Sequence, residues 1–264
     1  MIRAWEELKR RNRLLAWLGL AHLAVLAVLL VLMMADDRQL TGVNLWLKPS
    51  KFALSITVYL WTMAWLLGEL RSPRWLIGLA ATTIAAAMVT EQFLITLQAA
   101  RETTSHYNIA TPFDAAVFSL MGIGVAVNSA AAALVLGLFL FHPEAGRSAY
   151  IRGIQLGLMI FLLGSAQGFV MIANAGHTVG GADGGPGIPL LAWSVAHGDL
   201  RVAHFLGIHA IQVLPLAGWL LQRRQGSSHW KLAAVWVISL IYGALGLGVH
   251  LWALQGRALF AWWG

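Results

Sequence analysis

The sequence predicts an all-α, polytopic membrane protein with seven transmembrane helices, and three observations support this fold class. First, 59% of the 264 residues are hydrophobic and only 11% are charged, a composition that cannot cover an ordinary water-soluble surface. Second, the apolar residues form seven runs, each roughly long enough to cross a hydrocarbon core about 30 Å thick as a helix. Third, basic residues are distributed unequally between the connecting segments.

The predicted helices follow the apolar runs in chain order. They cover residues 14–34, 51–67, 75–97, 113–141, 151–175, 200–221 and 230–254. The first run follows the basic segment KRRNR and is longer than the apolar core of a signal peptide, so we interpret it as a retained anchor. We expect one membrane domain, residues 1–264, with a Gly- and Pro-rich outer loop at 176–199.

Orientation follows from the basic residues, because cytoplasmic segments of membrane proteins carry an excess of Lys and Arg. With the N-terminus inside, twelve of the eighteen basic residues fall on the cytoplasmic side: Arg3, Lys9, Arg10, Arg11, Arg13, Arg71, Arg74, Arg147, Arg152, Arg223, Arg224 and Lys231. We therefore predict a cytoplasmic N-terminus and an extracytoplasmic C-terminus. The Arg-rich, Lys-poor composition favours a bacterial cytoplasmic (inner) membrane. The net charge of +7 then requires no nucleic acid.

The segments predicted to lie outside are longer and chemically richer than those predicted to lie inside. They are DDRQLTGVNLWLKPSK, QAARETTSHYNIATPFD and NAGHTVGGADGGPGIPLLAWSVAHGDLR. Binding and catalysis tend to occur on loops carried by a rigid scaffold, so we expect the working face on the extracytoplasmic side. Within the third segment, the glycines and prolines favour a lid over the site, and a flexible linker is the alternative.

Polar residues inside the predicted helices cluster towards the same side. An ionisable group in the bilayer costs roughly 2.5 to 3.5 kcal/mol, so such residues usually face a bundle interior and have a function. The outer halves of the third, fifth, sixth and seventh helices carry Glu91, Gln98, Gln167, Asn174, His204, His209, Gln212 and His250. We expect an outward-facing polar site between these four helices.

Helix geometry limits how the histidines can combine. At about 100° per residue, His204 lies on one stripe with His197 and Arg201, whereas His209 is roughly 140° away from His204. Two histidines around one centre therefore require a second helix, and His250 is the best candidate because it lies at a similar depth. His106, in the segment SHYN just past the third helix, is a further candidate ligand.

Three chemical interpretations fit these residues. In the first, His204 or His209 with His250 binds haem b, and Arg201 or Arg101 pairs with a propionate. In the second, His204, His250 and Glu91 bind a non-haem metal ion such as iron or zinc.

The third interpretation has no metal, and the same groups form a proton-linked pocket in which Glu91 or a histidine titrates. The plain alternative is that each histidine only hydrogen-bonds a neighbouring helix. The absence of cysteine excludes thiolate ligands and disulfides.

Two further features have mainly structural interpretations. The segment KPSK, residues 48–51, begins the second helix with its proline in the first turn, and its lysines are interpreted as headgroup anchors. The tryptophans, among them Trp46, Trp61 and Trp65, are interpreted mostly as interfacial or lipid-facing residues.

The segments KPSKF, RETTSHYN, GGPGIPLLAWS and GDLRVAHFLGIHAIQVLPL resemble those of a family of bacterial seven-helix integral membrane proteins. The resemblance extends from the second helix through the sixth and implies a bacterial multi-pass membrane protein. It implies no particular activity, because none is established for that family.

The leading functional hypothesis is a redox protein that binds haem b or a metal ion, with His204 and His250 as ligands and Glu91 as a ligand or proton relay. Arg101 and Arg201 would hold anionic groups. If the protein is an enzyme, we expect a membrane oxidoreductase acting on a small molecule or quinone. The alternative is a proton-linked permease or sensor that uses the same pocket without metal.

Overall fold

A computed structural model describes residues 2–144 and 146–263, and it is all-α apart from short two-residue strands. Within these residues, seven helices are long and apolar enough to cross a membrane. They are α2 (Arg13–Ala35), α3 (Leu47–Leu67), α4 (Arg74–Ala100), α5 (Pro112–Leu140), α6 (Ala149–Ala173), α7 (Leu200–Gln222) and α8 (Ser228–Leu254). The predicted number of long apolar helices is confirmed, and their bounds agree with the predicted ones to within a few residues.

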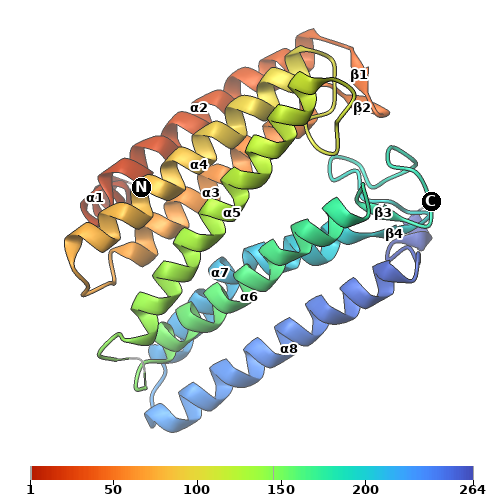
Figure 1. Ribbon diagram of the computed structural model, residues 1–264. Coiled ribbons are helices and arrows are strands. Elements are labelled where there is room, and N and C mark those ends of the chain that lie inside the picture. Colours follow the sequence, from red (N-terminus) through yellow and green to blue (C-terminus); the bar gives the residue numbers. More distant parts are fainter. Residues whose placement is uncertain (1, 145, 264) are drawn as a thin grey trace. The chain divides into compact units, whose positions relative to one another are not determined.

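The chain divides into two compact units, residues 1–131 and 132–264, with the boundary inside α5. Unit 1 holds α2, α3, α4 and most of α5, and α2 packs against both α3 and α4 (Figure 1). Unit 2 holds α6, α7 and α8, of which each contacts the other two.

Unit 1 begins with a short helix that the sequence analysis did not predict, α1 (Ile2–Arg11). Arg11 connects it to α3, because its guanidinium donates to the Glu69 carboxylate at 2.6 Å and lies 4.0 Å from the ring centre of Trp65. The guanidinium groups of Arg10 and Arg11 lower the pKa of Glu7 to about 2. Ion pairs and aromatic contacts therefore hold α1, a polar helix without an apolar run, in its position beside α3.

Helices α2 and α3 approach closely where a glycine faces a tryptophan. Gly19 leaves room for the Trp61 ring, and the Trp61 indole N–H donates to the carbonyl of Ala16 at 3.1 Å. Thr57 donates to the carbonyl of Gly19 at 3.2 Å. Asn12 caps α2 by accepting a hydrogen bond from the Leu15 amide, which satisfies one of the free donors at that helix end.

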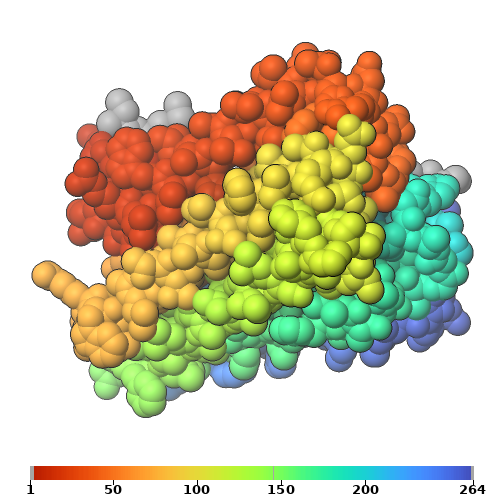
Figure 2. Space-filling model, turned by 45° about the horizontal axis from the view of Figure 1, so that its top comes forward, coloured from red at the N-terminus to blue at the C-terminus, as the bar shows by residue number. Residues whose placement is uncertain are grey.

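One end of unit 1 carries two loops that lie side by side, residues 36–46 and 101–111 (Figures 1 and 2). The first loop contains the antiparallel pair β1 (Gln39–Leu40) and β2 (Val43–Asn44). Arg38 pairs with both Asp36 and Glu102 and so joins the two loops. We call this end the polar end of unit 1.

Trp46 is an exception among the tryptophans, which are interpreted as mostly interfacial or lipid-facing. It is only 7% exposed and packs in a core cluster with Leu29 and Ala53. Its indole N–H donates to the Asp36 carboxylate at 2.9 Å. An acceptor in the neighbouring loop thus allows the amphipathic ring to be buried.

In unit 2, α6 and α7 are in close contact along a series of small residues. A Cβ atom at Gly164 would lie 2.5 Å from the Cα of Gly207, and one at Gly157 would lie 2.9 Å from the carbonyl oxygen of Ala210. Small residues let helix backbones approach closely, which supplies the packing energy that association within a bilayer depends on. Helix α8 joins this pair through Tyr242, whose hydroxyl donates to the Leu206 carbonyl at 2.6 Å.

The loop between α6 and α7 has a defined structure. Strand β3 (Thr178–Val179) pairs antiparallel with β4 (Gly198–Asp199), and Gly187 forms a bridge to Ser194. The Asp183 carboxylate accepts hydrogen bonds from the amides of His177 and Thr178. These contacts fold the Gly- and Pro-rich segment back upon itself. The described part of the C-terminal segment ends with the short helix η1 (Ala261–Trp263).

Candidate functional site

Glu91 is the most unusual polar residue of unit 1. It lies on α4, nine residues before the helix ends, and is only 5% exposed. Its Oε2 atom is buried and has no hydrogen-bond partner within residues 2–144 and 146–263. A buried polar atom without a partner costs roughly 1 to 3 kcal/mol. Most native sites avoid this loss of folding free energy.

His106 connects Glu91 to the polar end of unit 1. Its Nε2 atom lies 3.7 Å from the Oε1 atom of Glu91. Its Nδ1 atom lies 3.2 Å from the ammonium nitrogen of Lys48 and 3.0 Å from the hydroxyl of Ser105. Because an ammonium group can only donate, Nδ1 accepts and the neutral ring carries its proton on Nε2, facing Glu91.

The resulting arrangement is a chain of three titratable groups, Lys48, His106 and Glu91, which we call the Glu91 relay. It joins a buried carboxyl to an imidazole whose side chain is 26% exposed. The rings of Phe52, Tyr107 and Phe118 surround the imidazole, with centres 6.0 to 6.4 Å from it.

The loop that carries His106 is held in a specific shape. Asn108 donates to the Thr103 hydroxyl and to the Thr104 carbonyl, and its own side-chain oxygen accepts from the Ala110 amide. Tyr107 has a φ of +57°, which is uncommon for a bulky residue and costs about 1 kcal/mol or more. The loop thus folds back along α4, so that His106 lies near Glu91 and not at the helix end. The residues that make these contacts belong to the segment RETTSHYN.

Arg101, an expected cofactor-binding residue, lies in a second polar group of unit 1. It donates to the Asp114 carboxylate at 2.6 Å and lies 4.5 Å from the ring centre of Phe113. Gln98 and Thr111 also donate to Asp114, at 2.9 and 2.6 Å. This group links the end of α4 to the beginning of α5.

In unit 2, His204 and His209 occupy different environments on α7. His204 donates from Nδ1 to the Gly164 carbonyl at 2.8 Å, so its neutral ring has the lone pair on Nε2. His209 lies 3.1 Å from the Gln212 side-chain oxygen, and its ring centre is 4.2 Å from that of Phe205. The two histidines have separate partners, in agreement with the angle of roughly 140° expected from helix geometry.

His250 lies on α8, and its Nδ1 atom is buried without a hydrogen-bond partner in the described residues. Tyr242 of α8 contacts Leu206 of α7, and Ala253 of α8 contacts Gly198 in β4, directly before α7 begins. His204 and His250 each lie between these two contacts, on neighbouring helices. The structure thus places the two candidate ligands in the same unit and in the same section of the α7–α8 pair.

Arg201, the other residue expected to hold an anionic group, pairs with Asp199. Arg201 donates to both carboxylate oxygens, at 2.9 and 2.6 Å, and also to the Ala192 carbonyl. Burial alone would raise the pKa of Asp199, but the bonds and charge of Arg201 and the Ser194 amide hold this pKa below its ordinary value. The pair fixes the start of α7 to the preceding loop.

A metal site with several protein ligands is not evident. Within residues 2–144 and 146–263, no three His, Cys, Asp or Glu side chains are grouped so that they could hold a metal ion. Glu91 and His106 belong to unit 1, whereas His204, His209, Arg201 and His250 belong to unit 2. We therefore treat the Glu91 relay and the histidines of unit 2 as two separate candidate sites.

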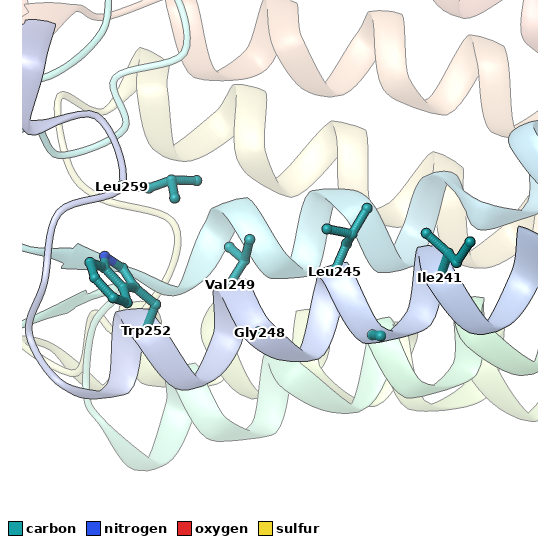
Figure 3. A pocket seen from close by; sticks show the side chains of 7 residues that line it. Ile241, Leu245, Gly248, Val249, Trp252 and Leu259 are labelled. Atoms are coloured by element: carbon teal, nitrogen blue, oxygen red, sulfur yellow. The ribbon is translucent and has the colours of Figure 1, made fainter.

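An open groove on α8 has a different character. Figure 3 shows Ile241, Leu245, Val249 and Trp252 on α8, with Leu259 of the C-terminal segment beside them. Ala244 and Gly248 complete the lining, which offers almost no hydrogen-bonding groups. Because α8 exposes most of its length, we interpret this groove as lipid-facing surface.

No protein-family model matches the sequence, and no curated protein or solved structure is significantly similar to it. The fold defines the chain as a multi-pass membrane protein through its seven apolar helices. Its function must therefore be inferred from the two candidate sites themselves.

Glu91 and His106 are identifiable from the sequence, but their connection with Lys48 is not. The segment KPSK indicates a headgroup anchor, whereas the structure places Lys48 against the imidazole of His106. The sequence contains one feature that indicates a further role for Lys48. A second basic residue, Lys51, follows three positions later and so lies on the same face of the helix. A pair of lysines at a helix N-terminus opposes the helix dipole, which suggests that a negative partner is nearby.

Proposed function

We propose that this protein is a proton-linked permease of a bacterial cytoplasmic membrane and that Glu91 carries the proton. The observation that supports this proposal most strongly is the buried Oε2 atom of Glu91 at the end of the Glu91 relay, which has no hydrogen-bond partner among the residues that the structure describes. An ionisable residue inside a membrane helix usually marks a proton or substrate pathway. Here the residue also has a neighbour through which a proton can reach it.

The relay moves a proton in two steps. A proton from outside binds His106 at Nδ1, which requires Lys48 to turn its ammonium away, and the imidazole then gives its Nε2 proton to Glu91. The 3.7 Å gap exceeds hydrogen-bonding distance, so the side chains must approach by roughly 1 Å before this transfer. Lys48 stabilises the carboxylate form of Glu91 when the proton leaves, since it carries the opposite charge.

Replacing Glu91 tests this proposal at its centre. Glu91→Gln keeps the shape and polarity of the side chain but cannot exchange a proton, so it should abolish function with little loss of folded protein. An infrared pH titration of the reconstituted protein measures whether this carboxyl titrates.

The proposed orientation places the N-terminus in the cytoplasm and the polar end of unit 1 outside. Twelve of the eighteen basic residues support it, because inner loops retain Lys and Arg. The chain has no cysteine, so single cysteines report topology without background.

In intact cells, a membrane-impermeant maleimide should label Asp37→Cys, and it should label Ser227→Cys only after the cells are opened. Both positions are exposed, so differences in burial do not confound the result. The reverse pattern would place the Glu91 relay on the cytoplasmic side and contradict the proposed direction of proton entry.

Haem b or a metal ion bound in unit 2 is the second candidate, and one observation favours it. His204 donates from Nδ1 to a backbone carbonyl, the arrangement that leaves Nε2 free to act as a ligand. His250 supplies a second imidazole on the adjacent helix, and its Nδ1 atom has no partner in the described part of the chain. These residues fit a two-histidine centre, which would add electron transfer to the protein's chemistry.

An absorption spectrum with metal analysis tests the second candidate. If unit 2 binds haem b, the detergent-purified protein shows a Soret band and sharpened α and β bands after reduction. The band should then disappear in both His204→Ala and His250→Ala but persist in His229→Ala, a control on the exposed first turn of α8. A colourless, metal-free protein in which cofactor loss is excluded would rule this candidate out.

A further inference from the structure

The end of unit 1 opposite the polar end carries an excess of positive charge. Helix α1, the beginning of α2, the end of α3 and the beginning of α4 lie together there (Figure 1). Its segments 2–13 and 68–75 contain three acidic and seven basic residues, which are Glu6, Glu7 and Glu69, and Arg3, Lys9, Arg10, Arg11, Arg13, Arg71 and Arg74. Segments 36–51 and 98–114 at the polar end are balanced, with four acidic and four basic residues. We call the positive end the basic end of unit 1.

The acidic side chains of the basic end are already engaged by neighbouring bases. The ion pairs are Glu6–Lys9, Glu7–Arg10, Glu7–Arg11 and Glu69–Arg11. Three further arginines are exposed and have no ion pair in the part of the chain that the structure describes: Arg3, Arg13 and Arg74. The basic end thus has more positive charge than its own carboxylates neutralise.

Exposed apolar surface follows Arg13 along α2. Trp17 and Leu20 lie four and seven residues after Arg13, so the three side chains share one stripe of the helix. Trp17 is 48% exposed and Leu20 is 37% exposed. In a helix that spans a membrane, such a surface meets acyl chains. Arg13, the first residue of this helix, therefore lies where the acyl chains end and the headgroups begin.

Helix α1 lies beside the same stripe. The ring of Trp5 is edge-on to the ring of Trp17, with 5.3 Å between the ring centres. Arg3 comes two residues before Trp5. Because tryptophan prefers the headgroup region of a bilayer, this surface combines an interfacial aromatic pair with positive charge.

We propose that the basic end of unit 1 binds an anionic phospholipid, whose phosphate contacts Arg13 and whose acyl chain lies along Trp17 and Leu20. Arg3 and Arg74 add positive charge that attracts the headgroup. No covalent bond is made or broken. The inference goes beyond the proposed function and does not depend on it, because the Glu91 relay is joined to the polar end of the unit.

The charge of the basic end favours an anionic headgroup over a zwitterionic one. A phosphatidylcholine headgroup has its own ammonium group, which is repelled by an end that is already positive. A phosphatidylglycerol headgroup carries only the negative charge of its phosphate, and a guanidinium can bond two phosphate oxygens at once. Each basic residue strengthens binding to anionic lipid about fivefold, which corresponds to about 1 kcal/mol.

Thermal unfolding of the detergent-purified protein tests this inference, with phosphatidylglycerol, phosphatidylcholine of the same acyl chains and inorganic phosphate as probes. Phosphatidylglycerol should raise the unfolding temperature in a saturable way, because a ligand that binds only the folded state stabilises it. Phosphatidylcholine and inorganic phosphate should raise it much less, since the first has no net charge and the second has no acyl chains. Equal effects of the two lipids, or of phosphatidylglycerol and inorganic phosphate, would overturn the proposal.

Substitutions of single arginines test the position of the lipid. Arg13→Gln should weaken phosphatidylglycerol binding about fivefold, whereas Arg13→Lys should keep most of it because lysine retains the charge. The control Arg224→Gln removes one positive charge from an exposed position in unit 2 and should bind as wild type does. If Arg13→Gln binds as tightly as wild type, or if Arg224→Gln loses as much affinity as Arg13→Gln, the proposed site is wrong.

Arg3→Gln and Arg74→Gln decide the outcome if Arg13→Gln does not fold, which its unfolding temperature without lipid reports. Both variants should also bind phosphatidylglycerol more weakly than wild type. Added salt should reduce the preference for phosphatidylglycerol over phosphatidylcholine, because it screens exposed charges. A preference that both variants and high salt leave unchanged would show that the arginines of the basic end do not bind the headgroup.

Discussion

At the scale of single residues, the buried acids of this protein have two different roles. Asp199 is 4% exposed, and hydrogen bonds from Arg201 and from the Ser194 amide satisfy both of its carboxylate oxygens. Glu91 is equally buried but keeps one oxygen without a partner in the described chain. A satisfied buried ion pair is typical of a structural role, whereas an unsatisfied acid is typical of a site that changes its protonation or binds a ligand.

Asp199 allows a prediction about acid stability. Its folded-state pKa lies below the ordinary value, so it stabilises the fold above the unfolded-state pKa of about 3.9. This contribution is lost as the pH falls from about 4 through the folded-state pKa. Asp199→Asn should lower the free energy of unfolding at neutral pH by about 1 to 3 kcal/mol and flatten its decline in acid.

Thermal unfolding in detergent at several pH values measures both effects, with Asp37→Asn as the exposed control. If Asp199→Asn and Asp37→Asn have the same acid profile as wild type, the ion pair with Arg201 does not contribute to stability.

At the scale of helices and strands, the sequence was most informative where the membrane dictates the pattern. Each long helix follows an apolar run because the bilayer requires every backbone group in it to be satisfied within the segment. The α1 helix was missed because it has no apolar run, and its position depends on contacts of Arg11 with Trp65 and Glu69, more than fifty residues away. The two-residue strands depend on loop contacts in the same way.

The packing of α6 against α7 leads to a prediction at this scale. A Cβ atom at Gly164 would lie 2.5 Å from the Gly207 backbone, whereas one at Gly168, a single turn further along α6, would meet nothing within 4 Å. Gly164→Ala should therefore force the helices apart and destabilise the protein by about 1 to 3 kcal/mol. Gly168→Ala should be neutral or slightly stabilising, since alanine favours helix more than glycine does.

Unfolding temperatures of the two variants in the same detergent compare these effects directly. A loss of stability in Gly168→Ala equal to that in Gly164→Ala would mean that helix contact at Gly164 is not what the substitution disturbs.

Part of the candidate site can be predicted from the sequence, and part of it cannot. Glu91 is identifiable because an acidic side chain within an apolar run has a high free-energy cost in the bilayer. Its link to His106 was not identifiable, because it depends on the fold of loop 101–111, where Tyr107 takes a left-handed φ and Asn108 bonds back to Thr103. Lys48 reaches His106 across 58 positions of sequence, and helix periodicity cannot predict a contact of that kind.

At the scale of the whole molecule, each of the two compact units contains a candidate site of polar residues. Unit 1 contains the Glu91 relay and unit 2 the histidines of α7 and α8. A redox centre in unit 2 and a proton site in unit 1 are compatible in one protein. The candidate sites therefore make independent predictions, and failure of the haem test leaves the proposed proton relay intact.

Proton exchange at Glu91 is tested by an infrared pH titration of the membrane-reconstituted protein, comparing wild type with Glu91→Gln and the exposed control Glu102→Gln. A protonated carboxyl without a hydrogen-bond partner absorbs in a region that ionised carboxylates leave clear. We predict a reversible carboxyl band in wild type and Glu102→Gln that is absent from Glu91→Gln. Identical spectra in all three proteins would show that Glu91 does not exchange its proton and would contradict the proposed function.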